Sequence, residues 1–209
     1  MTTNLATVLA GSRLLPVLTV PSVASAGPLA DALAAGGPRC AEVAFRTPDA
    51  SRVVKAMTAH GALTVGAGTV LTAQQAEQAV AAGARFLVSP GFDEEVIGAA
   101  CKLGVPVVPG VATATELMRA LKAGIDTVKL FPAEPLGGTG MLRALAAPFP
   151  RVRFVPTGGI GPGHLAAYLG HPSVLAVGGS WIATPGHLER GEYDEIRRLT
   201  AEAVERTAP

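Results

Sequence analysis

One lysine lies inside an apolar, strand-like run of this chain, where its amine could do covalent chemistry. Lys129 stands between Val128 and Leu130 in the run 127–131. Burial disfavours the charged ammonium, so a lysine in such a run loses its proton more easily than an exposed one. The neutral amine is a nucleophile toward carbonyl groups. A second interpretation stays open, in which Lys129 lies at a strand end and extends its charge into water.

A carboxylate and a guanidinium occur together in the segment 41–48. Glu42 and Arg46 are separated so that strand alternation would point both side chains to one face of the chain. Arginine presents a planar fork of donors that suits a substrate carboxylate, and a buried glutamate can transfer protons. The alternative is a structural ion pair between the two residues.

Glycine turns follow several strand-like runs. Pro156-Thr157-Gly158-Gly159 and Gly178-Gly179-Ser180 each combine unshielded backbone amides with a hydroxyl, which favours binding of a phosphate group. Val65-Gly66-Ala67-Gly68 precedes the hydroxyl of Thr69, and its glycines would let the backbone approach a ligand. Close packing between strands would also explain glycines at these positions.

Histidines and cysteines give no pattern of metal ligands. The four histidines are scattered without an HxH or HExxH spacing, and Cys40 and Cys101 fall in unrelated segments without a CxxC spacing. We expect no metal, no disulfide, and two small core cysteines in a reducing cytoplasm.

Composition indicates a compact α/β fold and gives no sign of a nucleic-acid or membrane partner. The chain has 209 residues, of which 49% are hydrophobic, 16% charged and 4% aromatic, and its net charge is +1. Its basic residues form no cluster typical of nucleic-acid binding, and charges, prolines or glycines interrupt every apolar stretch before the length of a membrane span. The N-terminus lacks the features of a signal peptide. We expect one domain, residues 1–209, in the cytoplasm.

Short apolar runs alternate with alanine-rich helical patterns along the whole chain. Helices are predicted at 73–82 and 114–123, each with an N-terminal threonine cap and a following glycine, and Thr113 with Glu116 fits a capping box. The pattern predicts a (β/α)8 TIM barrel, with residues 2–10 as an extra N-terminal helix, and an open doubly wound sheet is the alternative. The eight predicted strands are 16–20, 41–45, 64–68, 86–89, 105–109, 127–131, 152–156 and 174–178.

Several of these segments occur in the order seen in one enzyme family. The chain resembles the bacterial 2-keto-3-deoxy-6-phosphogluconate (KDPG) aldolases and 4-hydroxy-2-oxoglutarate (KHG) aldolases over nearly its whole length. The segments that carry the resemblance are Glu42-Val43-Ala44-Phe45-Arg46-Thr47-Pro48, Val65-Gly66-Ala67-Gly68-Thr69-Val70, Val88-Ser89-Pro90-Gly91, Val108-Pro109-Gly110-Val111, Val128-Lys129-Leu130-Phe131-Pro132-Ala133-Glu134, Pro156-Thr157-Gly158-Gly159-Ile160 and Gly178-Gly179-Ser180-Trp181.

The resemblance implies a class I aldolase that forms a Schiff base and needs no cofactor. Its substrate would be a 2-keto-3-deoxy phosphosugar acid, cleaved to pyruvate and glyceraldehyde 3-phosphate, and the enzyme would be a homotrimer. It implies Lys129 and Glu42 as catalytic residues. The substrate-binding residues that it implies are Arg46, Thr69, Pro90, Phe131, Thr157, Gly158, Gly159, Gly179 and Ser180.

Three other functions fit the same motifs. An aldolase for the galactonate epimer of the substrate would differ at one carbon, which short motifs do not resolve. A phosphosugar isomerase or epimerase would use the phosphate-binding turns without a reactive lysine. A noncatalytic phosphate-binding barrel would use Lys129 only to neutralise charge.

Overall fold

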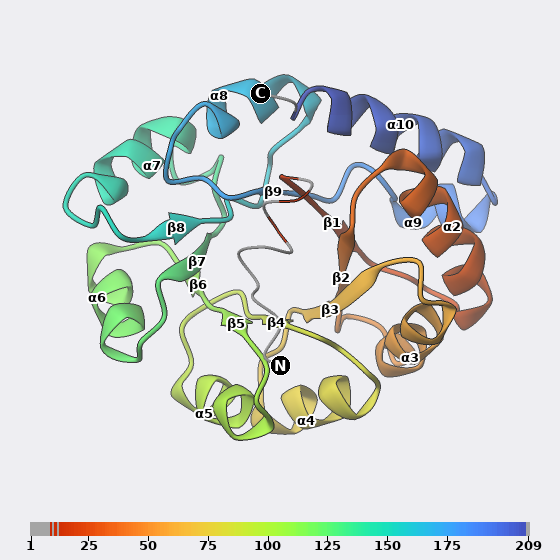
Figure 1. Cartoon of the computed structure of the whole chain (residues 1–209), viewed down its shortest axis with the longest axis horizontal. Coiled ribbons are helices and arrows are strands. Elements are labelled where there is room, and N and C mark those ends of the chain that lie inside the picture. The colour runs from red at the N-terminus through yellow and green to blue at the C-terminus, as the bar shows by residue number, and fades with distance from the viewer. Residues whose placement is uncertain (1–8, 10, 12, 208–209) are drawn as a thin grey trace.

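The computed structural model describes residues 9, 11 and 13–207 of the chain. They form an α/β fold in which a curled parallel sheet encloses an interior and the helices lie outside it (Figure 1). Because helices cover only the outer side, an open doubly wound sheet, which carries helices on both faces, does not describe this chain. The expected N-terminal helix at 2–10 falls almost entirely outside the described residues.

The strands form two sheets. Six strands pair in the order β5-β4-β3-β2-β1-β9 and three in the order β6-β7-β8, and every strand pairing within the sheets is parallel. Their bounds are β1 Leu14–Leu18, β2 Cys40–Ala44, β3 Thr64–Gly68, β4 Leu87–Val88, β5 Val107–Val108, β6 Gly110–Val111, β7 Thr127–Leu130, β8 Arg153–Phe154 and β9 Val177–Gly179.

The two sheets approach each other at both of their ends. Pro109 alone separates β5 from β6, since proline has no N–H to contribute to a ladder. The predicted strand 105–109 is therefore two short strands. At the other end, Thr157 forms an isolated parallel bridge with Gly178, and the N–H of Leu175 donates to the carbonyl of Phe154 at 3.0 Å.

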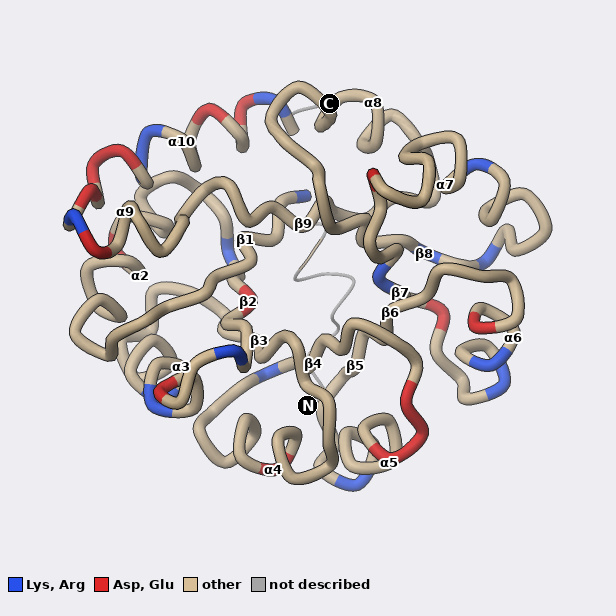
Figure 2. Tube along the Cα trace, turned by 180° about the vertical axis from the view of Figure 1, so that it is seen from behind, with Lys and Arg blue, Asp and Glu red and all other residues tan. Residues whose placement is uncertain are grey.

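Helices follow the strands in alternation, and α4 and α6 begin at the predicted threonine caps. Their bounds are α2 Ala26–Gly36, α3 Ala50–His60, α4 Ala73–Ala81, α5 Glu94–Leu103, α6 Ala114–Lys122, α7 Gly138–Ala146, α8 Leu165–Leu169, α9 Pro185–Glu189 and α10 Tyr193–Glu205, with 3-10 turns at Val23–Ser25 and Pro162–His164. Thr72 caps α4 and Thr113 caps α6, where the predicted capping box with Glu116 is present. Most Lys, Arg, Asp and Glu positions lie on this outer layer (Figure 2).

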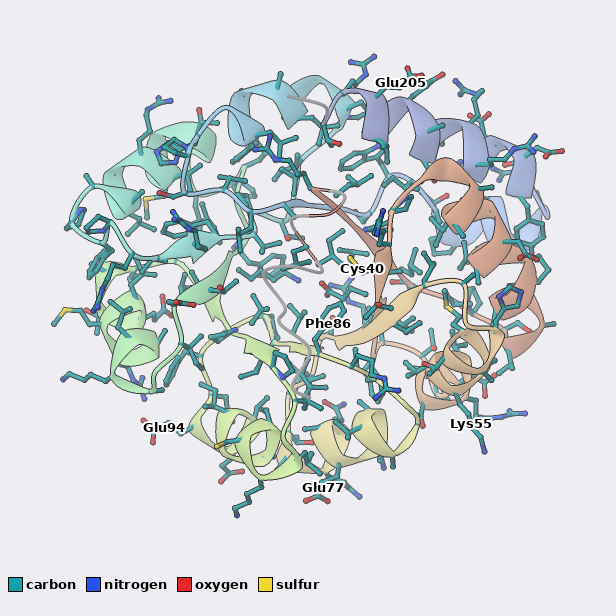
Figure 3. All side chains as sticks on the ribbon, viewed as in Figure 1. Cys40, Lys55, Glu77, Phe86, Glu94 and Glu205 are labelled. Carbon is teal, nitrogen blue, oxygen red and sulfur yellow. The ribbon has the colours of Figure 1, made fainter. Side chains whose placement is uncertain are left out.

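Side chains alternate between two buried clusters. Those that point outward from the strands pack under the helices, among them Val43, Ala67, Val128 and Phe154. Inward side chains of the strands, together with residues next to the strands and Leu9, form a second cluster: Leu9, Leu15, Cys40, Phe86, Val88, Val108, Val155 and Ala176. Figure 3 shows Cys40 and Phe86 within the ring and Lys55, Glu77, Glu94 and Glu205 on its periphery.

One cysteine prediction is wrong. Cys40 belongs to the interior cluster as expected, but Cys101 is exposed, because it lies on the outer side of α5 near the C-terminal end of that helix. Within the part of the chain that the structure describes, no helix is both long and apolar enough to span a membrane.

Candidate active site

Lys129 lies inside the curled sheet. Its neighbours Val128 and Leu130 pack in the outer cluster, so alternation along β7 points Lys129 to the interior. The residue is 5% exposed. The alternative in which Lys129 extends its charge into water is therefore excluded.

The partner of Lys129 is Glu42, on the opposite side of the interior. Glu42 follows the same alternation on β2, between Ala41 and Val43 of the outer cluster, and it is fully buried. The Nζ of Lys129 lies 3.2 Å from Oε1 of Glu42. Oε2 of Glu42 is buried and has no hydrogen-bond partner among the described residues. One carboxylate oxygen thus holds the lysine, and the other remains available to a ligand.

Gly68 makes room for this pair. A Cβ added at Gly68 would lie 1.9 Å from Oε1 and 2.4 Å from Cγ of Glu42. The glycine was expected to bring the backbone close to a ligand, whereas it makes room for the carboxylate of Glu42. Gly110, which pairs with Lys129 across β6 and β7, is equally constrained, because its Cβ would lie 2.0 Å from the carbonyl oxygen of Pro90.

Aromatic and proline residues lie next to the pair. The ring centroid of Phe131 is 5.2 Å from Nζ of Lys129, within the range of a cation–π contact. Pro90 is half-buried and lies two residues after the end of β4. With its carbonyl against Gly110, Pro90 lies beside the strand that pairs with β7.

The prediction that strand alternation carries Arg46 into the site is wrong. β2 ends at Ala44, and the N–H of Arg46 donates to the carbonyl of Ala44 at 2.8 Å in a tight turn. Arg46 is exposed and forms no ion pair among the described residues. The adjoining Phe45 donates its N–H to the carbonyl of Gly68, the last residue of β3, at 2.7 Å. Arg46 therefore lies at the edge of the sheet where β2 and β3 both end.

Thr69 combines a half-buried position with an unusual backbone. Its φ is +54°, a left-handed conformation that β-branched residues rarely adopt. Such strained residues concentrate at functional sites. Thr69 directly follows β3 and therefore the glycine that contacts Glu42.

The two glycine turns predicted from the sequence lie side by side. Gly178 donates its N–H to the carbonyl of Pro156 at 2.8 Å, in addition to its bridge with Thr157. Gly158 and Gly159 have φ of +103° and +76°, which only glycine adopts without strain. Ser180 is exposed, and Thr157 is buried. The turns therefore form one continuous edge next to Phe131 and Pro132, which the Cβ of a residue at 158 would contact.

Packing accounts for part of this glycine pattern. A Cβ at Gly178 would lie 2.1 Å from Oγ1 of Thr157, and one at Gly179 would lie 2.5 Å from the ring of Trp181. These two glycines are required by their neighbours, whatever the site binds. Trp181 was not expected in this role. Glu134 ends the motif around Lys129 but was given no role, and Tyr168, which donates to Glu134, lies in none of the motifs.

No metal centre is evident in the described part of the chain. It contains no group of three or more His, Cys, Asp or Glu side chains arranged to hold an ion.

The interior lysine and its carboxylate define a class of protein: α/β enzymes that use a lysine amine as a nucleophile toward carbonyl substrates. Within that class, the chain belongs to the KDPG and KHG aldolase family, whose model matches residues 5–199.

Curated relatives and solved structures agree with this membership. The 2-dehydro-3-deoxy-phosphogluconate aldolase of Treponema pallidum is 50% identical and covers 92% of both chains. The KHG/KDPG aldolase of Escherichia coli is 43% identical over 97% of this chain and 96% of its own. The KDPG aldolase of Legionella pneumophila, solved with pyruvate captured as a covalent carbinolamine, is 40% identical with a TM-score of 0.92, covering 96% of this chain and 98% of that one.

Proposed function

We propose that this protein is a Schiff-base aldolase that cleaves KDPG to pyruvate and glyceraldehyde 3-phosphate, and also KHG to pyruvate and glyoxylate. The observation that carries this proposal is the buried contact of 3.2 Å between Lys129 and Glu42. A buried amine next to a single carboxylate can exchange one proton with it, which produces a neutral nucleophile where the substrate carbonyl would bind.

Glu42 would move protons through the reaction. The amine of Lys129 attacks the C2 carbonyl, water leaves, and a protonated imine forms. Glu42 then takes the proton of the C4 hydroxyl, the C3–C4 bond breaks, and its electron pair moves to the iminium to give an enamine and an aldehyde. Protonation of the enamine at C3 and hydrolysis of the imine release pyruvate and restore Lys129.

The remaining residues would bind the two ends of the substrate. Arg46 and Thr69, at the edge of β2 and β3, would hold the carboxylate next to the imine. Pro90 and Phe131 would pack against the carbon chain. At the other end, the phosphate would bind at the adjoining turns, through Thr157, Gly158, Gly159, Gly179 and Ser180.

At the level of the fold, we infer a complete (β/α)8 barrel in one domain, with an extra helix at residues 2–10. The short separation of β5 from β6 and the bridge between Thr157 and Gly178 support closure at both ends of the six-stranded sheet. The assembly would be a homotrimer in the cytoplasm, to be tested by analytical ultracentrifugation and by fractionation of the source cells.

Borohydride trapping tests the chemistry directly. Pyruvate and sodium borohydride should give a stable adduct on Lys129, detected as a mass increase in the peptide that contains it, because only an imine is reduced in this way. The Lys129→Arg variant keeps a positive charge beside Glu42 but cannot form the imine, so it should show neither adduct nor turnover. An adduct on another residue, or turnover in this variant, would contradict the assignment.

Substrate preference requires a direct comparison. KDPG, its galactonate epimer and KHG should each be assayed with the wild-type protein under the same conditions. The proposal expects the highest kcat/KM for KDPG. A higher value for the galactonate epimer would identify the sister aldolase instead.

A further inference from the structure

Glu134 joins the segment after the lysine strand to the predicted phosphate turn. Its N–H donates to the carbonyl of Gly158 at 3.0 Å, and the N–H of Ala133 donates to the carbonyl of Thr157 at 2.8 Å. A Cβ at Gly159 would lie 2.7 Å from Cβ of Glu134, so the turn packs directly on this residue.

The side chain of Glu134 holds the other side of the turn. The hydroxyl of Tyr168 donates to Oε1 of Glu134 at 2.5 Å, and Nε2 of His164 lies 3.9 Å from Oε2. His164 also accepts the N–H of Gly161 at Nδ1, at 3.0 Å. Both residues follow the turn in sequence, on the 3-10 turn 162–164 and on α8. Glu134 is therefore connected to the chain before and after Gly159.

Tyr168 is built to donate this hydrogen bond at all ordinary pH values. The residue is fully buried. Burial, and then the hydrogen bond and the charge of Glu134, raise the pKa of Tyr168 well above its ordinary value. The hydroxyl stays protonated, and Glu134 offers it an oxygen in a fixed position.

Two consecutive glycines in left-handed conformations make the turn intrinsically adaptable, whereas backbone amides bind an anion well only when their directions are fixed in advance. We propose that Glu134 is a positioning residue for phosphate recognition, and that it holds the turn 157–161 in its binding conformation through Tyr168. This inference rests on the proposed function, and it adds a residue that determines the preference for phosphorylated substrates.

The Tyr168→Phe variant tests the inference by removing only the hydroxyl. The KM for KDPG should rise about tenfold, the effect of losing one hydrogen bond to a charged group, with little change in kcat. The KM for KHG, which has no phosphate, and the trapping of pyruvate by borohydride should stay within about twofold of wild type. Tyr193→Phe is the matched control, because Tyr193 lies half-buried on α10, and it should leave both substrates unchanged.

A double-mutant cycle separates positioning from general support of the fold. Glu134→Gln keeps an acceptor for the Tyr168 hydroxyl and should retain most of the selectivity for KDPG, whereas Glu134→Ala should lose it. Combining Glu134→Ala with Tyr168→Phe should add little to either change, since both remove the same contact. Equal losses for KDPG and KHG in Tyr168→Phe, or fully additive effects in the cycle, would overturn the inference.

Binding of inorganic phosphate keeps this test independent of catalysis. Calorimetry should show weaker binding to Tyr168→Phe than to wild type, and equal binding would count against the inference. Failure of the aldolase proposal would appear elsewhere, as the absence of a reducible pyruvate adduct in the wild-type protein.

Discussion

The pair of Lys129 and Glu42 places two opposite charges in an interior from which water is largely excluded. Each compensates the other, and removing one partner of a buried pair typically costs about 3 to 5 kcal/mol of stability. A truncation such as Lys129→Ala would therefore weaken the fold as well as the chemistry. Variants that keep a charge or a hydrogen-bond acceptor at each position separate the effect on catalysis from the effect on stability more clearly than truncations do.

Replacing Glu42 by glutamine should separate imine formation from proton transfer. Glu42→Gln should still give a borohydride adduct with pyruvate, slowly, but it should lose about 10² to 10⁴ in kcat, the usual contribution of a positioned acid or base. Single-turnover and steady-state rates would be measured on protein whose melting temperature has been checked. Turnover within threefold of wild type would remove Glu42 from the mechanism.

Arg46 is exposed at the edge of β2, so its substitution should leave stability nearly unchanged. If Arg46 holds the substrate carboxylate, Arg46→Ala should raise the KM for both KDPG and KHG, because both carry that group. Arg52→Ala, on the exposed side of α3, is the control. Unchanged kinetic constants for both substrates would rule out this role.

Ser180 offers a way to test the phosphate turns without disturbing their packing. It is exposed, unlike Gly178 and Gly179, where any Cβ meets a neighbouring side chain. Ser180→Asp places a negative charge beside the proposed phosphate and should lower kcat/KM for KDPG by more than about tenfold, with a smaller effect on KHG. Thr115→Asp adds the same charge on α6 and should affect neither substrate.

Among the elements, α2 and α10 pack most tightly at Gly36. A Cβ there would lie 2.4 Å from Cβ of Thr200, so Gly36→Ala should destabilise the protein by about 1 to 3 kcal/mol. Gly98, inside α5, has no heavy atom within 4 Å of the same position. Gly98→Ala should stabilise by about 0.5 to 1 kcal/mol, because alanine costs less conformational entropy in a helix. Urea unfolding of both variants checks the opposite signs.

Periodicity was sufficient to locate most elements, since strands and helices here follow local apolar patterns. The strand Thr64–Gly68 has the predicted bounds, and Ala73–Ala81 and Ala114–Lys122 differ from the predicted helices by one residue at one end. Strand ends were less predictable. They depend on hydrogen bonds to neighbouring strands, which is why β2 stops before Arg46 and β5 before Pro109.

The motifs and the family resemblance identified Lys129 and Glu42 separately, but they did not predict the contact between the two side chains. The role of Gly68 was not predicted either, because the need for space arises from a side chain on a neighbouring strand. The contact between Glu134 and Tyr168 could not be predicted from the sequence either. It joins residues 34 positions apart through tertiary packing, so the motif that contains Glu134 gives no indication of its partner Tyr168.

For the molecule as a whole, apolar side chains fill one end of the interior. Cys40 of the inner cluster stands two positions before Glu42 on β2, and Val155 stands two positions before Thr157 in the segment after β8. In these two segments, successive inward side chains therefore change from apolar to polar. Leu9 and Phe86 pack into the same layer, and polar molecules would have to enter from the other edge.

An interior that is open at one end determines the order in which the two reaction products leave. Lys129 is buried and Ser180 is exposed. In the proposed binding mode the substrate half attached to Lys129 would lie deeper than the half at the glycine turns, so the aldehyde should depart before pyruvate is hydrolysed and follows it. Product-inhibition kinetics should accordingly be ordered: pyruvate should compete with KDPG for the empty enzyme, whereas glyceraldehyde 3-phosphate should give mixed inhibition. The reverse pattern would require a second exit through the layer of Cys40 and Phe86.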